Sequence, residues 1–202
     1  MSRPYYYAAK EYLPGVTIVF DRFHVMKLVN ATVDKVRRKQ QIHLDDARNK
    51  AMKGCRFLFL SNYENLDDEK QSRLDQALKA NEPLFVMHTM KEQLRLLWTK
   101  SSKKQARKFL RTWAIDAIAE AYDYKARTGS TALMPLKKLA FSLLAHADGI
   151  LNYFKHRITN GKMEGINNKI KTLKRQAYGF RDKAYFRLRL LHLHAQKVHL
   201  AG

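Results

Sequence analysis

The sequence predicts a mainly α-helical protein with a small α/β portion at its N-terminal end. Apolar residues recur at helical spacing from Asp67 to Lys197, whereas only two short runs have strand character. The clearer run is Val-Thr-Ile-Val-Phe at residues 16–20, which is unbroken and apolar like a strand buried on both faces of a sheet. A hydrophobic content of 46% over 202 residues is sufficient for a folded core.

Local signals predict the N-terminal elements. Ser2 and Pro4 are typical of a helix start, and Pro14-Gly15 ends that helix before the strand at 16–20. A long helix is expected over 21–41, because valines and a leucine recur there at helical spacing. The run Arg-Phe-Leu-Phe-Leu at 56–60 fits a second strand or a helical turn equally well.

The rest of the chain predicts helices. Asp67 or Asp68 starts one, Pro83 lies in the first turn of the next, and Ser101-Ser102 precede a long one. Two further helices are expected at 133–156 and 182–198. We find no internal repeat and no Gly/Ser-rich linker, and divide the chain into residues 1–43, a helical region at 44–157, and basic helices at 158–202.

The charge balance indicates a polyanionic partner. Lys and Arg number 39 against 18 Asp and Glu, a net charge of +21. Nucleic acid is the polyanion that such a surface fits best, because neutralising its phosphates releases counterions. No apolar run is long enough to cross a membrane, and the single cysteine excludes an internal disulfide. We therefore expect a cytoplasmic, nucleoid-associated protein with no membrane partner.

The segment Ile-Thr-Asn-Gly-Lys-Met-Glu-Gly-Ile-Asn-Asn at 158–168 places one carboxylate, Glu164, in a strongly basic region. A carboxylate in the first turn of a helix is typical of capping, and it also suits a metal ligand beside DNA. The cations that follow lack balancing acids, which favours phosphate contacts. The candidate DNA-binding residues are Lys162, Asn168, Lys169, Lys171, Lys174, Arg175, Arg181 and Lys183.

Asp21 and His24 are a second candidate site. Their i, i+3 spacing puts both on one face at the start of the expected helix over 21–41. They fit an N-cap aspartate with a neighbouring histidine, and they equally fit a catalytic pair.

Two long stretches resemble a known family. They run from Tyr12 to Arg38 (YLPGVTIVFDRFHVMKLVNATVDKVRR) and from Asn160 to Leu190 (NGKMEGINNKIKTLKRQAYGFRDKAYFRLRL). Both are similar to bacterial insertion-sequence transposases of the ISL-three type, which are DDE enzymes, and the opening MSRPYYYAAKEYLP fits the same family. The resemblance implies an RNase H-like catalytic domain, here truncated, that carries a large helical insertion.

The resemblance also implies metal-dependent cleavage and strand transfer of DNA, at insertion-sequence ends and target sites. Two aspartates and a glutamate hold divalent ions, usually Mg²⁺, and Glu164 lies where the family has its glutamate. Asp21 and His24 match a supporting D-x-x-H motif, although Asp21 can also be read as the second catalytic aspartate. The first aspartate precedes this sequence in the family pattern, so we expect a DNA-binding fragment that is inactive alone.

The alternative is a truncated regulator that inhibits transposition by occupying DNA or by pairing with full-length transposase or with itself.

Overall fold

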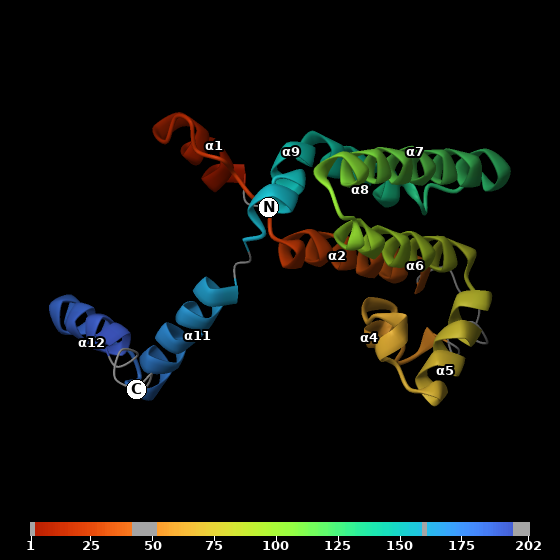
Figure 1. The fold of residues 1–202 in the computed structure, drawn as a ribbon. Helices are drawn as coiled ribbons and strands as arrows, with labels where there is room; N and C mark the ends of the chain where they lie inside the picture. Colours follow the sequence, from red (N-terminus) through yellow and green to blue (C-terminus); the bar gives the residue numbers. More distant parts are fainter. Residues whose placement is uncertain (1–2, 42–51, 159–160, 196–202) are drawn as a thin grey trace. The chain divides into compact units, whose positions relative to one another are not determined.

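The computed structural model describes residues 3–41, 52–158 and 161–195, and the regular elements in these ranges are all helices (Figure 1). The chain forms two compact units, an N-terminal unit of Met1–Ile158 and a C-terminal unit of Thr159–Gly202. No helix in the described ranges is long and apolar enough to cross a membrane.

The helices of the N-terminal unit follow one another with short connections. They are α1 (Arg3–Tyr12), α2 (Arg22–Gln41), α4 (Arg56–Leu60), α5 (Asp68–Lys79), α6 (Glu82–Arg95), α7 (Lys103–Thr128), α8 (Met134–Ala145), α9 (Ala147–Leu151) and α10 (Tyr153–His156). Single 3₁₀ turns lie at Tyr63–Asn65 and Leu96–Thr99.

Several helix starts confirm the sequence signals. Asp67 caps α5 by accepting a hydrogen bond from the Lys70 main-chain N–H, and Ser102 caps α7 through the N–H of Gln105. Pro83 lies in the first turn of α6, where its missing N–H costs nothing. These caps satisfy main-chain donors that a helix start leaves unpaired.

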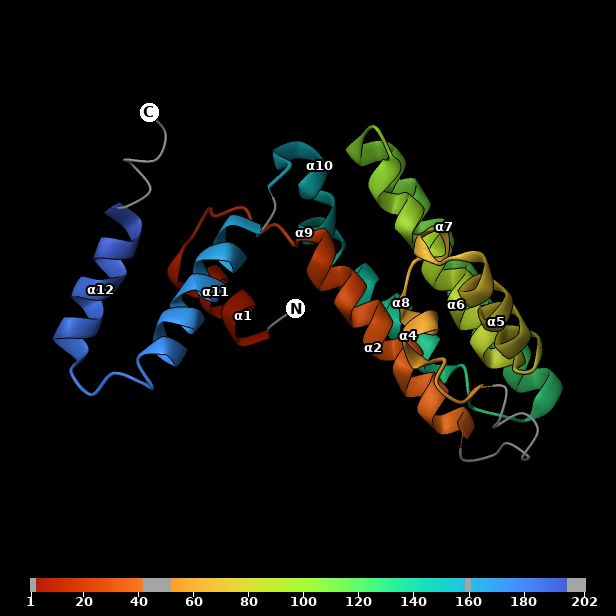
Figure 2. The same ribbon diagram turned by 90° about the horizontal axis from the view of Figure 1, so that it is seen from below.

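The core of the N-terminal unit lies between α2, α6, α7 and α8. Helix α2 packs against α4, α6 and α8, and α7 packs along α8 and against α6 (Figures 1 and 2). Val25, Val29 and Val33 of α2 are fully buried in this core, as their spacing predicts. Trp113 of α7 is also buried, and its indole N–H donates to the Met90 carbonyl of α6 at 2.9 Å.

The predicted strand at 16–20 is wrong. In the described ranges the chain has no strand, and residues 16–20 are an irregular segment that leads into α2. Its main chain bonds to helices instead, because the Phe20 N–H donates to the Gly149 carbonyl at 2.9 Å and the Asn152 amide donates to the Ile18 carbonyl at 3.0 Å. Local β propensity does not make a strand without a neighbouring strand to pair with.

The predicted helix over 133–156 is broken into α8, α9 and α10. His146 leaves the helical conformation, with φ −110° and ψ 15°, and separates α8 from α9. This break orients α9 so that Gly149 receives the ring and N–H of Phe20. The ambiguous run at 56–60 is the helix α4, in which Leu58 and Phe59 are buried.

Two buried charged groups connect helices of the N-terminal unit. Asp34 of α2 accepts hydrogen bonds from Arg37 and lies 3.3 Å from Arg56 of α4. Burial raises the pKa of the Asp34 carboxyl, but the Arg37 hydrogen bonds and the nearby guanidinium groups outweigh it, so the net pKa is lowered. Lys91 of α6 is 1% exposed and donates to the Phe59 carbonyl at the end of α4.

The C-terminal unit contains α11 (Gly161–Gln176) and α12 (Lys183–Ala195), joined by a short turn. Leu173 of α11 is buried, and Phe180 in the turn lies 4.8 Å from the Phe186 ring of α12, measured between ring centroids. Asp182 caps α12, as expected, by accepting from the Ala184 and Tyr185 N–H groups at 2.7 and 3.1 Å.

Candidate nucleic-acid interface

The basic candidates of α11 lie on an exposed face. Leu173 is buried, Ile166 and Ile170 are half-buried, and the polar positions between them are exposed, so the helix is amphipathic in the way its spacing predicts. The exposed candidates on this helix are Asn168, Lys169, Lys171, Lys174 and Arg175. No hydrogen bond or ion pair is found for the side chains of Lys171 and Arg175 in the part of the chain that the structure describes, so these cations are available to an anionic partner.

The turn after α11 directs the chain into α12. Tyr178 and Gly179 both have positive φ, 49° and 101°, and the Gly179 N–H donates to the Lys174 carbonyl at 2.9 Å. This left-handed ending satisfies carbonyls at the end of α11. Arg181 and Lys183 follow the turn and are exposed, so the candidate cations continue from α11 to the start of α12.

Lys174 differs from its neighbours because it has a contact within the unit. Its ammonium lies 5.0 Å from the centroid of the Phe186 ring of α12, within the range of a cation–π interaction. Lys174 therefore contributes to joining α11 and α12, and its role as a DNA contact stays a prediction.

Glu164 and Lys162 belong to the first turn of α11, but their side chains lie outside the described residues. The main chain places Glu164 near the N-terminal end of the helix, where a carboxylate is stabilised by the helix dipole. Its role as a metal ligand stays a prediction.

Asp21 begins α2. One carboxylate oxygen accepts from the Phe23 N–H at 3.0 Å, and the Asp21 carbonyl accepts from Val25, so Asp21 has the contacts of an N-cap. His24 is exposed, and its ring packs edge-on against Phe23 at 5.7 Å between centroids. The D-x-x-H spacing thus lies at a helix start in the N-terminal unit, whereas Glu164 belongs to the C-terminal unit.

The described residues do not by themselves fit a divalent metal ion. Within the described ranges no three His, Cys, Asp or Glu side chains lie close enough together to hold one. Hard divalent ions take several oxygen ligands, so Asp21 with His24 is insufficient.

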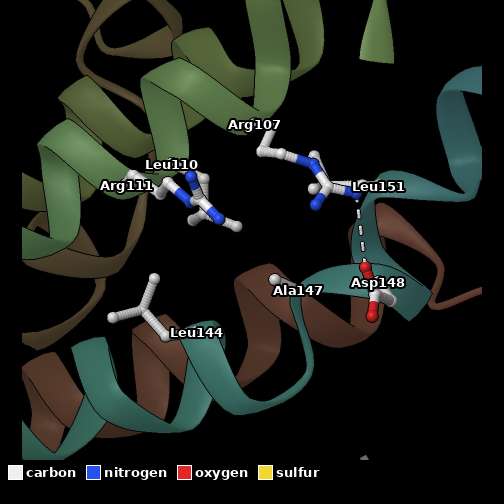
Figure 3. A pocket seen from close by; sticks show the side chains of 7 residues that line it. All are labelled: Arg107, Leu110, Arg111, Leu144, Ala147, Asp148 and Leu151. Atoms are coloured by element: carbon white, nitrogen blue, oxygen red, sulfur yellow. Dashed lines mark hydrogen bonds and ion pairs between the residues drawn. The ribbon is translucent and has the colours of Figure 1, made fainter. Parts of the chain in front are cut away.

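The sequence prediction missed two arginines of α7, Arg107 and Arg111. The signal that could have found them is the segment Lys-Lys-Gln-Ala-Arg-Lys-Phe-Leu-Arg at 103–111, which holds five cations and no acid. In the structure these two side chains line a common hollow beside α8 and α9 (Figure 3).

Strong positive charge on exposed helix faces is typical of a protein that binds a polyanion. Comparison with known proteins identifies the class more closely. The family model for ISL-three DDE transposases, described as "Transposase", matches residues 1–190. The chain belongs to this transposase family.

A curated relative gives the same result. The chain is 34% identical over 193 residues to the transposase for insertion sequence element IS1001 of Bordetella parapertussis. The match covers 94% of this chain and 45% of that protein, so the chain spans about half the length of the relative. DDE transposases in general act with divalent metal ions. No solved structure matches the chain.

Proposed function

We propose that this chain binds DNA in transposition, at insertion-sequence ends and target DNA, through the backbone phosphates. The observation that carries the proposal is the exposed cationic face of α11, which continues past the turn to Arg181 and Lys183. Phosphate contacts of this kind position a protein on DNA without reading its sequence. The net charge of +21 and membership of a transposase family support the same partner.

Substitution of Lys171 and Arg175 by Gln tests this proposal. Both side chains are exposed, so the double variant keeps the fold and loses two phosphate contacts. We expect the slope of log K against log salt concentration to decrease in magnitude by about 1.8. The measurement is fluorescence anisotropy of a labelled 30-base-pair duplex between low and physiological salt.

The matched control removes two charges elsewhere. Lys79 and Lys125 are exposed in the last turns of α5 and α7, and their replacement by Gln changes the net charge equally. Equal slopes for the two double variants would show that α11 contributes only general charge, and would contradict the proposed interface.

We also propose that Glu164 descends from the third acid of the DDE triad, that residues 3–41 derive from an RNase H-like core, and that Asp21 and His24 support that site. In the intact family enzyme the acids would hold Mg²⁺. Glu164 is the only acid between residues 158 and 180, and a single carboxylate holds Mg²⁺ weakly. The purified 202-residue chain is therefore expected to be inactive alone.

Incubation with supercoiled plasmid and Mg²⁺ or Mn²⁺ measures this directly. We expect neither nicked nor joined product above the background of a metal-free sample. Cleavage by this chain that disappears in Glu164→Ala would mean that the missing ligands are present after all, and that the chain is a complete nuclease.

A regulatory role is a second candidate. It is favoured by the share of the relative that the chain spans, since a DNA-binding portion without cleavage activity would compete with a full-length transposase for DNA or pair with it. Co-expression with an active element should then lower the transposition frequency, and an unchanged frequency would count against this role.

A further inference from the structure

The strongest unassigned feature of the N-terminal unit is a hollow of about 320 Å³ beside the first half of α7. Seven residues from α7, α8 and α9 line it, and the side chains of Arg107 and Arg111 extend from α7 across it (Figure 3). They are Arg107, Leu110, Arg111, Leu144, Ala147, Asp148 and Leu151. We propose that this hollow binds a phosphate group of the DNA backbone; this inference rests on the proposed DNA-binding function.

The chemistry of the lining selects an anion. Arg107 and Arg111 are one helical turn apart, so their guanidinium groups reach the same space. Guanidinium donors in a planar fork match phosphate oxygens in a two-bond geometry that Lys does not reproduce. Leu110, Leu144 and Ala147 supply apolar walls, which strengthen the attraction because they exclude the water that would screen it.

The internal counter-charge of the hollow is weak. Asp148 is the acid in the lining, its side chain is 87% exposed, and its carboxylate lies 3.4 Å from Arg107. Arg111 has neither an ion pair nor a side-chain hydrogen bond in the described ranges, and it is exposed. One net positive charge therefore remains in the hollow, and Asp148 holds Arg107 toward it when no phosphate is bound.

Neighbouring cations extend the surface. Lys104 and Lys108 lie on the same face of α7, one turn before each arginine or beside it, and both are exposed. Lys103 is held by a 2.8 Å hydrogen bond to the Asn152 amide oxygen. A nucleic-acid backbone that placed one phosphate in the hollow would meet these lysines with its adjacent phosphates, whereas an isolated carboxylate would not use them.

The test is the double variant Arg107→Gln/Arg111→Gln in the full chain, with Lys79→Gln/Lys125→Gln as the charge-matched control. Charge-assisted hydrogen bonds contribute enough that the loss of two should weaken binding of the labelled duplex roughly tenfold or more. The salt slope should also decrease in magnitude by about 1.8. The control variant should change affinity by less than about threefold, since it lacks specific contacts.

Two single substitutions test the geometry. Arg111→Lys keeps the charge and loses the planar fork, so its affinity should lie between that of the wild type and the double variant. Asp148→Asn removes the competing carboxylate and should tighten binding of DNA about two- to fivefold. Circular dichroism of each variant checks that the helices are retained.

The outcomes separate this site from the proposed function. Equal losses in the arginine variant and the control, with the α11 variant still impaired, would overturn the phosphate site and leave DNA binding by α11 intact. A wild-type chain with no affinity for the duplex would overturn both. Binding of a poly-glutamate peptide that depends on the two arginines, together with DNA binding that does not, would assign the hollow to an acidic protein partner instead and overturn the inference.

Discussion

Replacement of Lys91 by Met is expected to lower the free energy of unfolding of the N-terminal unit by about 3–5 kcal/mol, the range for a buried charge network that loses one partner. Lys91 is 1% exposed, and its ammonium donates to the Phe59 carbonyl at 2.9 Å and to the Ser61 carbonyl. It also forms an ion pair with Glu92 at 3.0 Å. Met has a similar length but no donor, so two carbonyls and a carboxylate would lose their cation.

Denaturant unfolding followed by tryptophan fluorescence measures this loss. Trp98 and Trp113 are the two tryptophans of the chain and both belong to the N-terminal unit, so the signal reports that unit alone. Lys125→Met is the control, because Lys125 is exposed and its change should stay within about 0.5 kcal/mol. A loss below about 1 kcal/mol for Lys91→Met would show that Lys91 does not anchor α4 to α6.

The second large effect is a reversal of sign at Gly149. A Cβ atom at this position would lie 2.5 Å from Cδ2 and 2.6 Å from Cε2 of the Phe20 ring. Gly149→Ala should therefore destabilise the N-terminal unit by about 1–3 kcal/mol, as overpacking does. The displaced ring would also lose its stacking on Tyr6, at 6.0 Å between centroids, and its edge contact with His146 at 5.6 Å.

The same change in a Phe20→Ala background should be neutral or stabilising by up to about 1 kcal/mol. With the ring removed, the methyl group has space, and alanine is a better helix former than glycine. Unfolding curves of the two single variants and the double variant give the coupling between the positions. Additive effects would mean that Phe20 does not occupy the surface of α9.

Local chemistry predicted most helices of this fold. Asp67, Pro83 and Ser102 start their helices as expected, because a cap or an N-terminal proline acts within a few residues of chain. The buried valines of α2 were predictable for the same reason, since spacing alone determines which side chains share a face.

The failures occur where distant contacts decide the structure. Residues 16–20 have strand propensity, but their partners are Gly149 and Asn152, more than a hundred residues away. The break at His146 accompanies that contact, and no local signal marks it. The burial of Lys91 was equally unpredictable, because its acceptors come from α4.

The candidate site shows the same division. The exposed face of α11 follows from the spacing of its isoleucines and leucine, so the sequence predicted it. The pairing of Arg107 and Arg111 in one hollow needs α8 and α9 opposite them, and a sequence pattern does not contain that information. The metal-ligand roles of Glu164 and Asp21 rest on resemblance and stay predictions.

The sparse interior of the C-terminal unit affects the thermodynamics of any complex that it forms. Of the side chains described in residues 159–202, Leu173 alone is buried. Units of roughly 40–60 residues with little burial are marginally stable by themselves. Folding of α11 and α12 is thus expected to be coupled to association with a polyanion, so that the measured affinity is weaker than charge alone would give and the heat-capacity change on binding is strongly negative.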